Sequence, residues 1–195
     1  MNFSFPIILA SNSPRRQQLL AELGVHFEVK VVPVEESYPE DMDPEEVPVY
    51  LARKKAAAVA VVEKKALIIG ADTVVILNNT ILGKPENPER AAEFLRLLSG
   101  NTHQVVTGVC IIHQEKIRLF KDITRVRFDT LSDSEIVHYV NTCKPLDKAG
   151  AYGIQEWIGM AGVSGIEGSY FNVVGLPVQK LYRELKDLSY LISGL

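Results

Sequence analysis

Two long runs in the middle of the chain constrain its fold more than any other feature. Thr102–Ile112 and Lys116–Phe128 alternate, are rich in β-branched residues, and are separated only by His113-Gln114-Glu115. This pattern is typical of a long antiparallel β-hairpin with a short connection. We therefore expect a sheet that contains antiparallel strands.

Strand-like and helix-like segments alternate around this hairpin. Short apolar runs predict strands at Ile7–Ala10, Phe27–Val34, Ala66–Ile69, Thr73–Leu77 and Tyr170–Val174. Capping signals predict helices that follow Ser13, Asp43, Asn87 and Ser132 and one that opens at Pro177. We predict an α/β fold in which helices flank a mixed sheet and the long hairpin lies at its centre.

The chain is long enough to bury a sizeable core. Its 195 residues are 47% hydrophobic, which suits one domain over residues 1–195 or two small lobes with an active-site cleft between them. Gly70-Ala71-Asp72 predicts a bend between two strands, and Gly83-Lys84-Pro85 predicts a tight turn. In the helix that ends near Glu63, the predicted core stripe is Val47, Leu51, Ala58 and Val62.

The charge balance excludes one class of partner. Twenty-one basic and 24 acidic residues give a net charge of -3, so the surface as a whole does not attract polymeric nucleic acid.

The two cysteines, Cys110 and Cys143, form no CxxC pair, which suits a reducing compartment. Neither a membrane-spanning run nor a secretory signal is visible, so we expect a cytoplasmic protein without a membrane partner.

The segment Ser11–Arg16 predicts an anion site at a helix start. Ser13 occupies an N-cap position and Pro14 the first helical position, and Arg15 and Arg16 follow in the first turn. Basic side chains are unfavourable there because the helix N-terminus already carries partial positive charge. A bound phosphate, held also by the hydroxyls of Ser11 and Ser13, would remove the conflict. The alternative is an ordinary turn whose arginines face solvent.

Asp72 is the best candidate for a catalytic carboxylate. In the predicted bend it stands at a strand end, where α/β sheets bind ligands, and it could hold a divalent cation or accept a proton from water. It could instead bond to its own backbone in a turn. Glu35 and Glu36 follow the predicted strand Phe27–Val34 and could supply a second carboxylate, or they belong to a solvated acidic loop.

Lysines complete a possible phosphate site, although each alone is more typical of a surface residue. The chain contains neither a P-loop nor a dinucleotide-binding motif. Taken together, four basic residues would surround a polyphosphate while two carboxylates hold its metal, which is the combination that phosphoryl chemistry needs. The basic residues are Arg15, Arg16, Lys55 and Lys84, and the carboxylates are Glu36 and Asp72.

Several blocks in this order resemble the Maf family of nucleoside triphosphate pyrophosphatases. They are Ala10–Arg16, Leu51–Ala56, Gly70–Val75, Gly83–Pro85, Leu98–Val105, Pro145–Gln155 and Gly168–Pro177. Each block alone is unspecific, but together they span nearly the whole chain. The resemblance implies a single Maf/ITPase-like domain, hydrolysis of a nucleoside triphosphate to the monophosphate and pyrophosphate, and a divalent metal, Mg²⁺ or Mn²⁺.

The resemblance also implies roles for individual residues. Asp72 would be the proton acceptor, and Arg16, Lys55 and Lys84 would contact the phosphates. Glu36 matches the family's acidic position, where it would hold the metal with Asp72. A homodimer is also implied. The family is associated with septum formation as well, so an interaction protein that senses a nucleotide is an alternative.

Three positions indicate the substrate branch. Arg15, Thr73 and Gln155 resemble the branch that hydrolyses dTTP and UTP, whereas the branch acting on 7-methyl-GTP has tryptophan in place of the first arginine. A carboxamide can accept from the imide N–H of uracil or thymine and donate to a neighbouring carbonyl. Gln155 could make these bonds and reject cytosine, whose pattern is reversed. The sequence does not distinguish UTP from dTTP.

Overall fold

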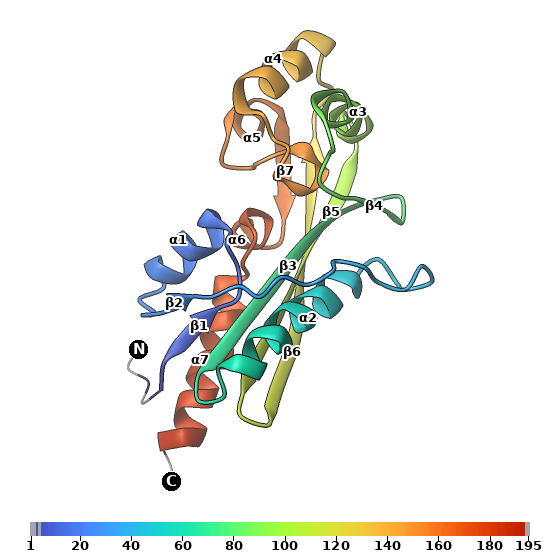
Figure 1. Cartoon of the computed structure of the whole chain (residues 1–195). Helices are drawn as coiled ribbons and strands as arrows, with labels where there is room; N and C mark the ends of the chain where they lie inside the picture. Colours follow the sequence, from blue (N-terminus) through green and yellow to red (C-terminus); the bar gives the residue numbers. More distant parts are fainter. Residues whose placement is uncertain (1–2, 4, 194–195) are drawn as a thin grey trace. The chain divides into compact units, whose positions relative to one another are not determined.

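A mixed sheet forms the framework of the chain in the computed structural model, which describes residues 3 and 5–193 and side chains as far as residue 188. Within these residues, seven strands pair in the order β2-β1-β3-β5-β6-β7, and β4 pairs with β3 (Figure 1). β1 is parallel to both β2 and β3. β4 is antiparallel to β3, and β7 is antiparallel to β6. The strands are β1 (Ile7–Leu9), β2 (Glu28–Val29), β3 (Leu67–Leu77), β4 (Thr80–Leu82), β5 (Thr102–His113), β6 (Lys116–Phe128) and β7 (Val163–Glu167).

Helices connect and flank these strands. They are α1 (Pro14–Glu22), α2 (Val47–Val62), α3 (Pro88–Leu98), α4 (Asp133–Cys143), the 3₁₀ turn η1 (Ala149–Ala151), α5 (Trp157–Gly162), α6 (Tyr170–Val174) and α7 (Val178–Ser193). Among the described residues, none of these helices combines the length and apolarity needed to cross a membrane. The predicted α/β fold with a mixed sheet and a central hairpin is therefore confirmed.

The described chain divides into two compact units. The first comprises the residues up to Asp72, Thr107–Asp122 and the residues from Gly175 onward. The second comprises Thr73–Val106 and Ile123–Val174. The boundaries fall inside β3, β5 and β6, so these three strands contribute residues to both units.

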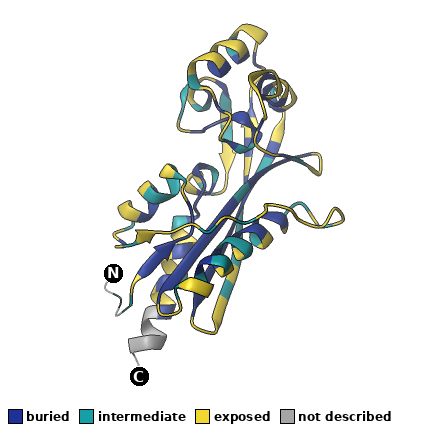
Figure 2. Cartoon of the chain, viewed as in Figure 1, coloured by how far each residue is buried: buried dark blue, intermediate teal, exposed yellow. Residues whose placement is uncertain are grey.

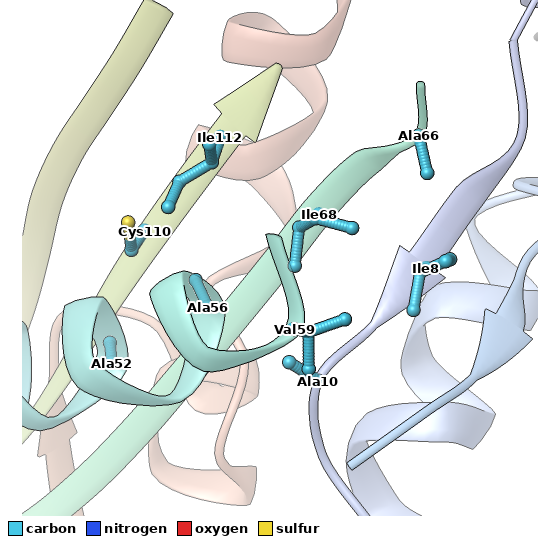
Figure 3. Close-up of a cluster of buried hydrophobic side chains, with 9 residues drawn as sticks. All are labelled: Ile8, Ala10, Ala52, Ala56, Val59, Ala66, Ile68, Cys110 and Ile112. Atoms are coloured by element: carbon cyan, nitrogen blue, oxygen red, sulfur yellow. The ribbon is translucent and has the colours of Figure 1, made fainter. Parts of the chain in front are cut away.

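The core of the first unit lies between α2 and the strands. Small residues on α2, among them Ala52 and Ala56, pack on Ile8, Ile68 and Cys110 (Figure 3). The close approach depends on glycine, because a Cβ atom on Gly70 would lie 2.4 Å from the carbonyl oxygen of Ala52. α7 lies on the other side of the strands from α2 (Figure 1). It buries Leu181, Leu185 and Leu188, which are spaced along one face of the helix.

The second unit is held together by packed helices and a buried polar junction. α3 packs against α4, whose N-terminus is closed by a capping box between Ser132 and Glu135. Asn172 on α6 is fully buried, and its Nδ2 donates to the carbonyl oxygen of Val105 at 3.0 Å and to Oγ1 of Thr124 at 2.9 Å. A buried amide needs hydrogen-bond partners, and Asn172 finds them on two strands. Its bonds therefore join α6 to β5 and β6.

Most predicted element starts are confirmed. The N-cap hydroxyl of Ser13 accepts from the backbone N–H of Arg16, and Pro14 begins α1. α3 is likewise capped by Asn87 and begins at Pro88. The hairpin of β5 and β6 also forms as expected, with Gln114 at positive φ in its connection.

The entry to α2 differs from the prediction. The helix begins at Val47 rather than after Asp43, whose carboxylate accepts from the backbone N–H of Glu45 in a separate turn. Two of the predicted core positions are also wrong: Ala58 is only half-buried and Val62 is 55% exposed. The buried stripe of α2 is Val47, Pro48, Leu51, Ala52, Ala56 and Val59, and Ala52 and Ala56 lie where the helix comes closest to Gly70.

Four further expectations are wrong. The predicted strand Phe27–Val34 shortens to the exposed pair Glu28–Val29. Tyr170–Val174 is helical, because Ser169 accepts from the backbone N–H of Asn172 and starts a turn. Gly83–Pro85 is an irregular segment rather than a tight turn. Gly70–Asp72 is not a bend, since β3 runs through it and is buried everywhere except at Thr73 (Figure 2).

Candidate active site

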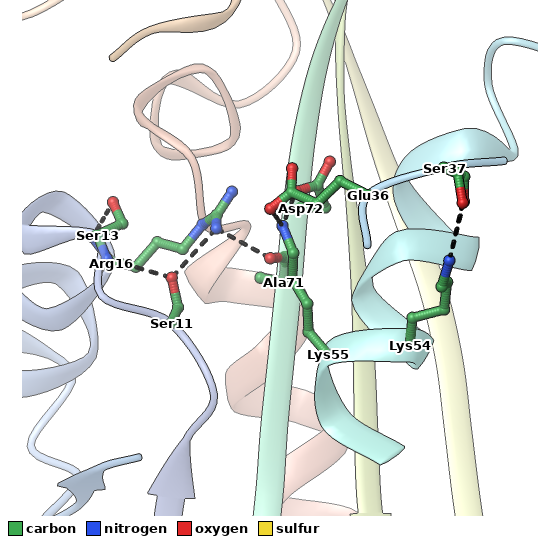
Figure 4. Close-up of polar contacts among 9 residues, drawn as sticks. All are labelled: Ser11, Ser13, Arg16, Glu36, Ser37, Lys54, Lys55, Ala71 and Asp72. Carbon is green, nitrogen blue, oxygen red and sulfur yellow. Dashed lines mark hydrogen bonds and ion pairs between the residues drawn. The ribbon is translucent and has the colours of Figure 1, made fainter. Parts of the chain in front are cut away.

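Arg16 is anchored within the first unit. Its Nε donates to the carbonyl oxygen of Gly175 at 2.9 Å. Its Nη1 donates to Oγ of Ser11 at 3.2 Å and to the carbonyl oxygen of Ala71 at 2.9 Å (Figure 4). Burial lowers the pKa of the guanidinium, and the nearby negative charge of Asp72 opposes this shift. The alternative in which Arg16 simply faces solvent is therefore wrong.

The turn before α1 is built from the same contacts. Oγ of Ser11 accepts from the backbone N–H of Ser13 at 3.3 Å as well as from Arg16. Ser11 is buried, whereas Ser13 and Arg15 are only partly buried. The serine hydroxyls and the arginine thus hold each other at the N-terminus of α1, where the helix dipole favours an anion.

Asp72, Lys55 and Glu36 form a second cluster in the first unit. Nζ of Lys55 lies 2.6 Å from Oδ1 of Asp72 and 2.9 Å from Oε1 of Glu36 (Figure 4). Asp72 is only 8% exposed, on β3, and Lys55 projects from α2. The neighbouring Lys54 points elsewhere, and its Nζ donates to the carbonyl oxygen of Ser37 at 3.0 Å. The predicted pair of carboxylates does converge.

The donor set of this cluster fits a hard divalent cation. Two carboxylates that face one positive charge, here the ammonium of Lys55, provide the oxygen ligands that Mg²⁺ prefers. No group of three or more His, Cys, Asp or Glu side chains suited to a metal occurs among the described residues. A site with only two protein carboxylates is typical of Mg²⁺ that is also held by substrate phosphates.

The remaining predicted residues belong to the second unit. Thr73 follows Asp72 directly on β3 and is partly buried. Lys84 is exposed, and its segment is fixed because the carbonyl oxygen of Gly83 accepts from the backbone N–H of Gly150 at 3.0 Å. Gln155 is exposed and lines a groove of about 570 Å³. Their functional roles stay predictions.

Sequence reasoning missed a polar network around Gln155. Lys148 is buried, and its Nζ pairs with Oδ1 of Asp147 at 2.7 Å and with Oε1 of Glu156 at 3.1 Å. The other carboxylate oxygen of Glu156 accepts a hydrogen bond from the hydroxyl of Tyr139. In a sequence, a lysine next to an aspartate normally suggests a solvated surface. The network becomes evident only from the structure, in which Lys148 is buried.

Comparison with known proteins identifies the family. The sequence model described as Maf-like protein matches residues 6–188. The chain belongs to the Maf family. Two similar proteins carry the name dTTP/UTP pyrophosphatase. The protein from Phocaeicola vulgatus is 55% identical over 94% of this chain and 96% of its own length, and the protein from Bacteroides fragilis is 53% identical over the same shares.

A solved structure also shows some likeness to this Maf chain. The Ham1 protein of Staphylococcus aureus superposes with a TM-score of 0.48 and 17% sequence identity, over 63% of this chain and 71% of that one. The family assignment rests on the sequence matches, which cover both the Ser11–Arg16 turn and the Asp72 cluster.

Proposed function

We propose that this chain is a dTTP/UTP pyrophosphatase that releases pyrophosphate and leaves the nucleoside monophosphate. The observation that carries the proposal is the convergence of Asp72 and Glu36 on Lys55. The name and high identity of its Maf relatives support the substrate class. A protein that only bound a nucleotide would have no need for a buried carboxylate able to activate water.

Glu36 and Asp72 are the residues that would hold the divalent metal. When bound, Mg²⁺ or Mn²⁺ supplies charge neutralisation of the phosphates. In our proposal the ammonium of Lys55, which now pairs with both carboxylates, turns to a phosphate oxygen of the substrate. The exchange keeps each charged group paired, which limits the cost of burying it.

The hydrolytic step uses Asp72 as the general base. Its carboxylate accepts a proton from a water molecule, whose oxygen forms a bond to the α-phosphorus. The bond between this phosphorus and the bridging oxygen of the β-phosphate breaks, and pyrophosphate leaves with that oxygen. Lys84 and Lys55 are proposed to stabilise the developing negative charge.

Arg16 has a more structural part in this proposal than the resemblance implies. Its Nε and Nη1 already donate to three protein oxygens, including the hydroxyl of Ser11. We therefore propose that Arg16 acts on a phosphate through its charge and by holding Ser11 in place. The hydroxyl of Ser13 caps α1 and keeps its N-terminal N–H groups oriented.

Base selection is assigned to Gln155, with Thr73 and Arg15 as helpers. The carboxamide of Gln155 would accept from the imide N–H of uracil or thymine and donate to a carbonyl oxygen. Cytosine would leave these polar groups unpaired, which is a strong basis for rejection. The proposal therefore predicts hydrolysis of UTP and dTTP but little hydrolysis of CTP.

A nucleotide panel tests the proposal. The purified protein is mixed with Mg²⁺ and with UTP, dTTP, CTP, GTP or 7-methyl-GTP, and pyrophosphate release is measured. Fastest release from UTP and dTTP is expected. Preferred hydrolysis of 7-methyl-GTP would contradict the substrate branch, and tight UTP binding without turnover would favour the sensor that the family's link to septum formation suggests.

Two finer points remain part of the proposal. We propose that the chain acts in the cytoplasm on a small nucleotide, without a polymeric nucleic acid or a membrane as partner. We also propose a homodimer, as the family resemblance implies. Sedimentation velocity on the purified protein tests the oligomeric state, and a single species at the monomer mass of 21.7 kDa would contradict it.

A further inference from the structure

Gln155 lies at the tip of a tight turn in the second unit. The backbone N–H of Glu156 donates to the carbonyl oxygen of Gly153 at 3.0 Å, so Ile154 and Gln155 are the central residues of a four-residue turn. The groove beside Gln155 is also lined by the apolar residues Met160, Ile166 and Tyr170. A groove of about 570 Å³ in which a few polar side chains, among them Gln155 and Ser164, lie beside apolar ones suits an aromatic ring with polar edges.

One buried hydroxyl holds the chain on both sides of Gln155. The hydroxyl oxygen of Tyr139 accepts from the backbone N–H of Gly153 at 3.0 Å, and the hydroxyl donates to Oε2 of Glu156. Tyr139 itself, on α4, is fully buried. Gly153, two positions before Gln155, and Glu156, immediately after it, are thus both hydrogen-bonded to the hydroxyl of Tyr139.

The carboxylate of Glu156 is held at both of its oxygens. Oε2 accepts from Tyr139, and Oε1 lies 3.1 Å from the ammonium of the buried Lys148. Burial raises the pKa of Tyr139, and its bond to Glu156 raises it further, so the hydroxyl remains a donor at neutral pH. Tyr139 therefore keeps its hydrogen bond to Glu156 as donor.

Close packing leaves the turn little freedom. A Cβ atom on Gly153 would lie 2.8 Å from Cδ of Glu156, and a Cβ atom on Gly159 would lie 1.9 Å from the carbonyl oxygen of Ile154. The backbone of α5 and the side chain of Glu156 therefore press directly against the turn. The turn of residues 153–156 is therefore constrained in three ways. Gly153 and Gly159 allow close packing, the Glu156 N–H bonds to Gly153, and the hydroxyl of Tyr139 bridges the two ends.

We infer that Tyr139, Glu156 and Lys148 are positioning residues that hold Gln155 in the geometry needed to select a pyrimidine base. The inference rests on the proposed function, in which Gln155 contacts the base. A carboxamide exchanges its donor and acceptor when it rotates, so it distinguishes uracil from cytosine only if its reach and orientation are fixed. Groups that pre-organise a contact of this kind increase selectivity without touching the substrate.

The central test is Tyr139→Phe, which removes the bridging hydroxyl and keeps the ring. The readout is kcat/KM for UTP divided by kcat/KM for CTP, with kcat and KM determined separately. We expect this ratio to fall about ten-fold, because small displacements of a positioned group have large kinetic effects. Glu156→Gln keeps the shape of the side chain and weakens the same bridge, so it serves if Tyr139→Phe does not fold.

Tyr152→Phe is the matched control. Tyr152 is another buried tyrosine of the second unit, but its hydroxyl lies 2.8 Å from Nε2 of His103 and does not contact the Gln155 turn. Tyr139→Phe loses two hydrogen bonds and Tyr152→Phe loses one, so both variants should melt at a lower temperature. Only Tyr139→Phe should change the UTP/CTP ratio, since a purely structural role would not affect selectivity.

A double-mutant cycle with Gln155→Ala separates the possible outcomes. If Tyr139→Phe acts through Gln155, adding it to Gln155→Ala lowers the ratio no further. An unchanged ratio in Tyr139→Phe and Glu156→Gln, beside a reduced ratio in Gln155→Ala, would overturn the positioning role alone. An unchanged ratio in Gln155→Ala itself would overturn both the positioning role and the proposed contact with the base, while UTP hydrolysis by the wild type would still support the pyrophosphatase.

Discussion

Nζ of Lys55 lies 2.6 Å from Oδ1 of Asp72, and this ion pair joins α2 to a buried position of β3. The contact depends on Gly70, two residues before Asp72, where the absence of a side chain lets α2 approach the strand. A packing requirement of the core thereby decides where a candidate catalytic carboxylate meets its cation.

Asp72→Asn is expected to lower pyrophosphate release from UTP by about 1,000-fold, because the amide cannot accept the proton of the attacking water. The fold should persist, since asparagine has nearly the same shape. Steady-state kinetics and circular dichroism check the two statements. Asp133→Asn, at an exposed carboxylate that pairs with Arg96, should keep wild-type activity. Wild-type activity in Asp72→Asn would remove Asp72 from the mechanism.

Lys55→Met is expected to raise the affinity of the nucleotide-free protein for Mn²⁺ about ten-fold. The ammonium that neutralises Asp72 and Glu36 is then gone, so the two carboxylates attract a cation more strongly. Isothermal titration calorimetry measures this affinity directly. Lys54→Met is the control, because Lys54 contacts Ser37 instead of either carboxylate. Equal Mn²⁺ affinities in the wild type, Lys55→Met and Lys54→Met would argue against Glu36 and Asp72 as the metal ligands.

Gly70→Ala is expected to destabilise the protein by about 2 kcal/mol, because the new methyl group overlaps the backbone of α2. It should also reduce activity by displacing Lys55. Denaturant unfolding gives the free energy of unfolding. Gly83→Ala, with no atom within 4 Å of the added Cβ, should be nearly neutral in stability. Similar losses in the two variants would show that close packing at Gly70 is not the cause.

Stability is expected to fall as the pH decreases from about 6.5 to about 4, because of His103. Burial lowers the pKa of His103 to about 4, whereas the unfolded chain has the ordinary value of 6.5. Between these values the unfolded state binds more protons, so lower pH favours unfolding, by about 3 kcal/mol at most. Denaturant unfolding at several pH values measures the effect, and the part due to His103 should disappear in His103→Gln.

Local signals predicted the starts of helices well. The caps at Ser13, Asn87 and Ser132 each use a hydrogen bond that spans only three residues, so the sequence contains both partners. The hairpin of β5 and β6 is similarly local, since a short connection joins two matching strands. These elements do not require knowledge of the rest of the fold.

Tertiary contacts decided the remaining elements. The glycine at position 70 suggested a bend, but it allows the close contact with α2, and β3 continues through it without a break. The segment Tyr170–Val174, expected to be a strand, is helical, and the side chain of Asn172 within it bonds to β5 and β6, which lie far from it in sequence. A sequence pattern cannot show which distant backbone group an amide will meet.

The sequence by itself determined the family and the mixed α/β fold, and it predicted an anion site at the start of α1 and the carboxylates expected to hold a metal. Only the tertiary structure revealed that Lys55 lies between these carboxylates, that Arg16 is anchored to Gly175 and Ala71, and that Tyr139 holds the turn of Gln155. The physical reason is that the type and local spacing of residues determine which functional groups are present and which helix ends are capped. Partners that are distant in sequence meet only after the core has packed.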